Sequence, residues 1–215
     1  MRDGEQDPSG QAVTGAAAEA ALGRLIAETR ALLSPLAGSL GGTLAHWPAA
    51  RHLHRSTPAA LPVLRWLPQA LDGCGCAPFA AALREAAPLL RWRQTYTAAE
   101  APAGFLERYG WTALVGPDGV LASDALACGV LLLGPATLYP SHAHAAEEFY
   151  LPLAGTADWQ QGDQSFRPRG PGTVIRHASE EPHAMRTGAE PLLALYLWQG
   201  DGIGAGARLA PPAAS

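Results

Sequence analysis

The stretch LYPSHAHAAEEFYLPLAG, residues 138–155, concentrates histidine, glutamate and tyrosine in a segment that otherwise has the composition of a strand. His142 and His144 are separated by one residue, and Glu148 and Tyr150 also have even residue numbers. Because side chains alternate between the two faces of a strand, all of these residues are expected on one face. Buried imidazoles and a carboxylate need partners, and one divalent cation can satisfy several of them at once. The segment therefore predicts a metal site.

A further ligand has to come from another strand. His183 is best placed, because it begins the strand-like run HAMRT after a proline-containing turn. His177 ends the run TVIRH and is the competitor, as a hydrogen-bonding neighbour of the ligands or as a surface residue at a strand end. Imidazole and carboxylate suit zinc, iron, manganese, nickel or cobalt, and the absence of a thiolate leaves that choice open. The predicted ligands are His142, His144, Glu148 and His183.

The predicted secondary structure around these residues changes from helices to strands near Leu90. Apolar residues recur at helical spacing from Ala16 to Leu36, and further helices are expected to begin at Pro62 and Pro78. After Leu90, short apolar or alternating runs separated by glycine and proline predict a sandwich or a small barrel. The expected organisation is a helical N-terminal region at 1–90 with a disordered lead at 1–15, a β-barrel at 91–205 and a flexible tail at 206–215.

The composition narrows the class of protein. The chain of 215 residues is 48% hydrophobic, which is enough to bury a core, and its formal net charge of −4 gives no reason to expect a nucleic acid or an anionic membrane as partner. The odd number of cysteines and the polar N-terminus argue against a disulfide framework and a signal peptide. We expect a soluble, cytoplasmic protein that acts on a small molecule, and a homodimer is compatible with these features.

Two motifs resemble those of the cupin family. The spacing His-x-His-x3-Glu-x6-Gly, from His142 to Gly155, is the first cupin motif, although its usual leading glycine is absent. The second motif is matched in part, because His183 follows a turn as expected but the usual proline and glycine before it are Ala178 and Glu180. The resemblance covers about half of the chain. It implies a mainly β fold, the double-stranded β-helix or jelly-roll barrel, after the helical N-terminal segment.

A longer pattern, Tyr139-Pro-x-His-x-His-x3-Glu-x-Tyr150, resembles the cupin-type dimethylsulfoniopropionate lyases, bacterial enzymes that cleave this osmolyte to dimethyl sulfide and acrylate. The helical N-terminal segment, the run WRQTYT and Trp198 extend the resemblance over most of residues 60–200. It implies one bound metal ion (Fe, Mn or Zn) and Tyr150 as the catalytic base. Tyr139 would be a second catalytic candidate and would line the substrate pocket with Trp198. The implied ligands are again His142, His144, Glu148 and His183.

β-Elimination from a sulfonium propionate requires a base beside the metal. The proton leaves the carbon next to the carboxylate while the sulfide leaves the following carbon, and a cation on the carboxylate acidifies that proton. Tyr150, two residues beyond Glu148, can act as the base if the cation lowers the pKa of its phenol. The sulfonium group suits aromatic walls, at about 1 kcal/mol for each contact. The aromatic residues available for such a wall are Trp92, Tyr96, Trp159, Tyr196 and Trp198.

Two other classes of function remain open. A cupin isomerase or dioxygenase acting on another small carboxylate would keep the same ligands but would use Tyr150 only as a pocket residue, and a related lyase could act on another leaving group. A non-catalytic, metal-bound cupin would bind or sense a small molecule and would need no base. The pair Tyr139 and Tyr150 favours elimination over an isomerase or dioxygenase, and the intact ligand set argues against a non-catalytic module.

Overall fold

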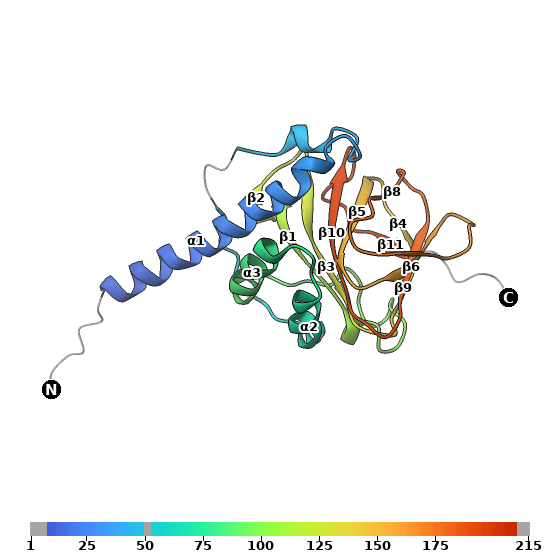
Figure 1. Ribbon diagram of the computed structural model, residues 1–215, viewed down its shortest axis with the longest axis horizontal. Coiled ribbons are helices and arrows are strands. Elements are labelled where there is room, and N and C mark those ends of the chain that lie inside the picture. Colours follow the sequence, from blue (N-terminus) through green and yellow to red (C-terminus); the bar gives the residue numbers. More distant parts are fainter. Residues whose placement is uncertain (1–7, 50–52, 210–215) are drawn as a thin grey trace.

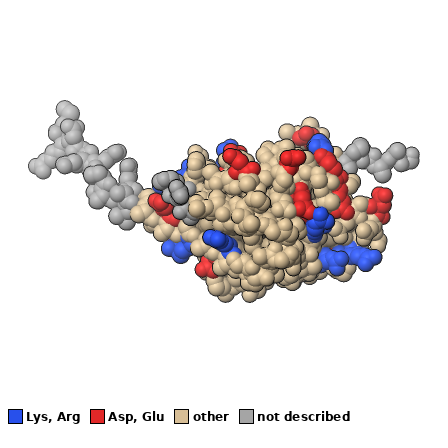
Figure 2. Space-filling view, turned by 90° about the horizontal axis from the view of Figure 1, so that it is seen from above, with Lys and Arg blue, Asp and Glu red and all other residues tan. Residues whose placement is uncertain are grey.

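Helices lie to one side of a strand-rich body in the computed structural model, which describes residues 8–49 and 53–209 (Figure 1). The α-helices are α1 (Pro8–Leu33), α2 (Leu67–Asp72) and α3 (Ala77–Ala86). Short 3-10 turns lie at Ser34–Leu36, Thr43–His46, Pro62–Trp66, Ala87–Leu89 and Leu106–Arg108. None of the helices in the described ranges combines the length and hydropathy needed to cross a bilayer. Acidic and basic side chains are mixed on the face seen in Figure 2.

The strands form a six-stranded and a five-stranded sheet. The larger sheet has the order β2-β1-β3-β10-β5-β8 and the smaller one has the order β11-β4-β9-β6-β7. The strands of the larger sheet are β1 (Tyr109–Gly116), β2 (Leu121–Ala122), β3 (Ala127–Leu133), β5 (Glu147–Ala154), β8 (Ile175–His177) and β10 (Leu192–Gln199). Those of the smaller sheet are β4 (Leu138–Ala143), β6 (Ala157–Gln161), β7 (Arg167–Arg169), β9 (His183–Thr187) and β11 (Arg208–Leu209). This arrangement agrees with the predicted jelly-roll barrel.

The larger sheet is buried on both faces. On β10, Leu193, Leu195 and Leu197 pack with the helices, whereas Leu192, Ala194 and Tyr196 belong to the cluster inside the barrel. Strands covered on both faces have near-continuous apolar sequences, as in LLALYLW. The alternation therefore separates a helix-covered outer face from an inner face that is free to carry polar chemistry.

Three boundaries differ from the prediction. Helix α1 begins at Pro8, so residues 8–15 are helical rather than a disordered lead, because the alanine-rich sequence that follows favours extension of the helix. Residues 1–7 and 210–215 lie outside the described ranges. The predicted strand WRQTYT is reduced to isolated bridges, Ala59 with Arg91 and Arg93 with Trp111, because the chain turns soon afterwards. Arg208–Leu209, predicted as tail, pairs with β4 and is fixed by an ion pair between Arg208 and Glu180.

Gly155, the last residue of the first motif, has a φ of +74°, and a Cβ atom there would collide with the carbonyl oxygen of Pro191. Gly162 has a φ of +52° but open space around it. We expect Gly162→Ala to lower the free energy of unfolding by about 1 kcal/mol, the cost of left-handed backbone alone. Gly155→Ala is expected to lower it by about 3 kcal/mol, because overpacking adds to that cost. Urea denaturation measures both, and equal losses would contradict the crowding at Gly155.

Candidate metal centre

The predicted ligands converge inside the barrel. His142 on β4, Glu148 on β5 and His183 on β9 are each about 1% exposed and place their donor atoms within 4.8 Å of one another. His144, just beyond β4, brings its Nε2 atom to 2.9 Å from Oε2 of Glu148. Nε2 of His183 lies 3.1 Å from the same oxygen. Both sheets thus contribute donors to one buried point.

The three histidines are oriented in the same way. In each, Nδ1 lies 2.8–2.9 Å from a backbone carbonyl oxygen two residues away. Since a carbonyl only accepts hydrogen bonds, Nδ1 carries a proton, and in the neutral ring Nε2 is left with a lone pair for a metal. Such outer hydrogen bonds commonly fix the rings of metal-binding histidines. The pairs are His142 with Pro140, His144 with Ala146, and His183 with Glu181.

The donor set fits a divalent cation. Lone pairs of imidazole nitrogens facing a carboxylate oxygen repel it unless a cation or a proton lies between them. Nε2 of His183 is buried and has no hydrogen-bond partner among the described residues, so the site offers a donor that the protein itself leaves unused. Two neutral imidazoles or more with one carboxylate are a usual set for a catalytic transition metal.

Burial and neighbouring side chains set the protonation states of Glu148 and His142. Burial raises the pKa of Glu148, but the neighbouring imidazoles of His144 and His183 outweigh this effect and hold that pKa well below its ordinary value. Burial lowers the pKa of His142 well below its ordinary value, and His183 adds to the effect. The carboxylate is therefore ionised and the His142 ring is neutral, as metal binding requires.

Trp198 contacts the centre directly. Its indole Nε1–H donates a hydrogen bond to Oε1 of Glu148 at 2.6 Å, and its ring stacks on His144 with centroids 4.2 Å apart. Because the indole occupies Oε1, the other oxygen is directed towards the histidines. Trp198 was predicted as a pocket residue, and it both lines the cavity and orients a ligand.

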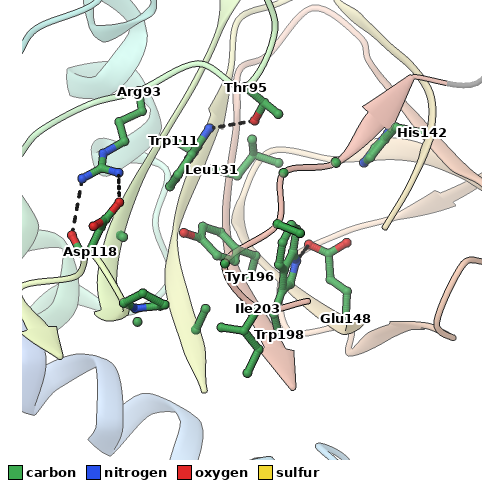
Figure 3. Close-up of a pocket in the computed structure, with 18 of the residues that line it drawn as sticks. Arg93, Thr95, Trp111, Asp118, Leu131, His142, Glu148, Tyr196, Trp198 and Ile203 are labelled. Carbon is green, nitrogen blue, oxygen red and sulfur yellow. Dashed lines mark hydrogen bonds and ion pairs between the residues drawn. The ribbon is translucent and has the colours of Figure 1, made fainter. Parts of the chain in front are cut away.

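A cavity of about 540 Å³ opens from this centre. Tyr139, Tyr150, His142 and Glu148 line one part of it. Figure 3 shows Trp111, Tyr196 and Trp198 between Glu148 and a second polar group, the ion pair of Arg93 and Asp118. Nη1 of Arg93 donates to Oδ2 of Asp118 at 2.8 Å. The cavity thus joins the candidate metal centre, an aromatic middle and the Arg93–Asp118 ion pair.

Three of the aromatic residues available for the wall, Trp92, Tyr96 and Trp159, do not line the cavity. Trp92 packs in the cluster beneath the helices and donates from Nε1 to the carbonyl oxygen of Ala87 at 3.3 Å. Its assignment to the pocket was wrong, because Arg93 and Thr95 of this segment line the cavity and Trp92 does not. Tyr96 lies behind the wall, where its hydroxyl contacts that of Tyr139 at 3.0 Å. Trp111 lines the cavity and was missed, although it lies in the alternating run YGWTALVG.

Comparisons with known proteins agree on one family. A family model for dimethylsulfoniopropionate (DMSP) lyase matches residues 43–194. The DMSP lyase DddQ of Ruegeria pomeroyi is 40% identical over 125 residues, which cover 56% of this chain. The match covers 62% of that protein, which is less than two thirds of its length. A crystal structure reported with the DMSP lyases RdDddP and RnDddQII is 33% identical, with a TM-score of 0.82 over 90% of this chain and 100% of that one. The crystal structure of DddQ from R. pomeroyi is 32% identical, with a TM-score of 0.78 over 91% and 98%.

His177 is buried beside the centre and is not the surface residue that was one of its two predicted roles. Its ring stacks on His183 with centroids 4.0 Å apart and an interplanar angle of 12°. Its ring nitrogens have no hydrogen-bond partner among the described residues. Burial lowers the pKa of His177 to about 3, and the nearby His183 adds to the effect.

This buried imidazole is expected to make the metal-free protein sensitive to acid. Below an ordinary pKa of 6.5 the unfolded chain binds a proton that the folded chain does not take up until about pH 3, so stability falls as the pH drops through that window. His177→Phe keeps a ring against His183 but removes the titration. The variant's free energy of unfolding, relative to wild type, should rise by about 2 kcal/mol between about pH 7.5 and 5.0. Urea denaturation at both pH values measures the change, and a constant difference would contradict it.

Proposed function

The chain belongs to the DMSP lyase family, and from this premise we propose that it cleaves DMSP by β-elimination to dimethyl sulfide and acrylate. The observation that carries the proposal is that Tyr139 and Tyr150 line the same cavity as His142 and Glu148 of the candidate metal centre. A carboxylate substrate at that centre would lie beside a phenol on either tyrosine. This is the combination that removal of a proton next to a carboxylate requires.

The ligands proposed for the cation are His142, His144, Glu148 and His183. A divalent cation held there would supply Lewis-acid chemistry, by binding the substrate carboxylate and acidifying the neighbouring carbon. The residues around it keep the ligands in place, with Trp198 on Glu148 and backbone carbonyls on the histidines. Addition of Fe, Mn or Zn salts to the metal-free protein determines which of these ions supports activity.

Tyr150 is the proposed base. It follows Glu148 by two residues on β5, is 4% exposed and lines the cavity. Burial raises the pKa of Tyr150 well above its ordinary value and the charge of Glu148 raises it further, so the phenol needs nearby positive charge before it ionises. The phenolate then takes the proton from the carbon next to the carboxylate. The electron pair of that C–H bond forms the C=C bond of acrylate, and the C–S bond breaks to release neutral dimethyl sulfide.

The aromatic middle of the cavity suits the sulfonium end of the substrate. Trp111, Tyr196 and Trp198 lie together, with ring centroids 6.1 Å apart for the first two and 6.2 Å for the last two. A cation against such rings gains about 1–2 kcal/mol when water is excluded. Because the sulfur becomes neutral as it leaves, this attraction acts on the substrate and is lost in the product.

A lyase acting on a larger carboxylate is the second candidate. The observation in its favour is that the cavity extends past the aromatic residues to the Arg93–Asp118 ion pair. A substrate with an additional polar group could reach this pair.

Headspace detection of dimethyl sulfide tests the proposal. Purified protein is given DMSP after removal of metal, and again after addition of Mn, Fe or Zn salts. We expect release of dimethyl sulfide and equimolar acrylate only with added metal. Absence of both products with every metal would contradict DMSP cleavage, and turnover of a larger thioether or sulfonium carboxylate would then favour the second candidate.

Tyr150→Phe is expected to lower kcat at least about 100-fold, because a positioned general base contributes that much or more. The metal content should remain that of wild type, since the phenol is proposed as the base and the ligand atoms are unchanged. Dimethyl sulfide release and elemental analysis of the same preparation measure the two quantities. Wild-type turnover in the variant would mean that another group is the base.

Two histidine variants distinguish a ligand from its neighbour. His183→Ala should lower the bound metal per chain, because it removes an Nε2 donor within 4.8 Å of those of His142 and Glu148. His177→Ala should leave the metal content unchanged, since His177 stacks on His183 but is not among the residues whose donor atoms cluster at the centre. Elemental analysis after dialysis measures the bound metal per chain in both variants, and their melting temperatures are checked to be equal. The opposite result would assign His177 as the ligand.

A further inference from the structure

A chain of hydroxyl groups runs along the cavity wall and reaches Tyr139. Nε1 of Trp111 lies 3.1 Å from Oγ1 of Thr95, and that oxygen lies 2.8 Å from the Tyr109 hydroxyl. The Tyr109 hydroxyl is 3.4 Å from that of Tyr139, which is also 3.0 Å from the hydroxyl of Tyr96. Figure 3 shows the first of these contacts, between Trp111 and Thr95. Neither the ligand set nor the proposed base uses Thr95 or Tyr109.

The chemistry of the first donor gives the chain a direction. An indole N–H can only donate, so the Thr95 oxygen accepts from Trp111 and has its own proton available for Tyr109. Tyr109 can then donate to Tyr139. This order gives Trp111, Thr95 and Tyr109 each an acceptor, as buried donors require, and hydrogen bonds in such a chain strengthen one another.

Tyr139 is held from two sides. Its ring stacks almost parallel on His142, with centroids 4.0 Å apart and an interplanar angle of 7°. Its hydroxyl oxygen can accept from both Tyr109 and Tyr96, which leaves its own proton free. Because Tyr139 lines the cavity beside His142, that proton is available to a ligand bound at the centre.

We propose that Thr95 and Tyr109 are positioning residues that hold the Tyr139 hydroxyl as a hydrogen-bond donor to the substrate carboxylate. The inference rests on the proposed elimination, in which negative charge moves onto that carboxylate as the proton leaves. A donor aimed at developing charge stabilises the transition state more than the bound substrate. Loss of either positioning residue should therefore act mainly on kcat.

Single and double variants of the metal-loaded full chain test this role. Thr95→Val should lower kcat about tenfold and change KM less than about threefold, because the hydroxyl is lost while the shape is kept. Thr95→Ser should restore kcat, since it restores the hydroxyl. In a Tyr139→Phe background, Thr95→Val should cause no further loss, because its effect passes through Tyr139. Thr97→Val is the matched control, because that exposed hydroxyl bonds to Glu100 and should not affect kcat.

Three outcomes would overturn the inference. They are an additive loss in the double variant, an effect on KM alone, and a Thr95→Ser variant as slow as Thr95→Val at equal melting temperature. Propionate, which carries the carboxylate but no leaving group, gives a readout that does not depend on turnover. Calorimetry should show about threefold weaker propionate binding for Thr95→Val and none of this loss for Thr95→Ser. If wild type releases no dimethyl sulfide, the proposed function fails, while equal propionate affinities would overturn the role of Thr95 separately.

Discussion

The structure depends on the burial of one carboxylate, that of Glu148. A charge in the barrel interior is costly unless neighbouring groups compensate it, and the hydrogen bond donated by Trp198 contributes to that compensation. Across the larger sheet, Glu148 lies between Trp198 on β10 and His177 on β8 in the strand register. Across the smaller sheet, His142 and His183 are themselves paired. The cross-strand set Trp198–Glu148–His177 therefore faces the pair His142–His183 inside the barrel. The distance between the two sheets places the donor atoms around one point.

The helices make this interior possible without contributing to it. The outer faces of β3, β5 and β10 are apolar and pack with α1 and α3 in one cluster. Burial of apolar side chains between the helices and the outer face stabilises the larger sheet. The inner face of this sheet can therefore carry tyrosines and a carboxylate in place of a hydrocarbon core. Among the roles a helical N-terminal region could have, this packing assigns it that of a cover on the sheet.

The sequence predicts the part of the site that follows a local period. Glu148 and Tyr150 share a face because β5 is regular, and the histidine spacing places His142 on β4. Trp92 was misplaced because it was chosen as an aromatic residue of the segment, whereas the residues of this segment that line the cavity are Arg93 and Thr95. Thr95 and Tyr109 could not be found from the sequence, because their contacts join residues 14 and 30 positions apart across the barrel. His177 was ambiguous for a similar reason, since its burial depends on the pairing of β8 with β5.

The two tyrosines of the longer pattern, Tyr139 and Tyr150, stand in different surroundings, which fits the different roles proposed for them. Tyr139 lies among hydroxyl donors and against a neutral imidazole, a setting that favours a fixed, protonated phenol. Tyr150 lies beside Glu148, whose charge opposes ionisation of the phenol. Neutralisation of that carboxylate by a bound cation would remove the opposition and leave a net positive charge nearby. Glu148 would then link occupancy of the centre to readiness of the proposed base, so that a chain without metal would also lack an active base.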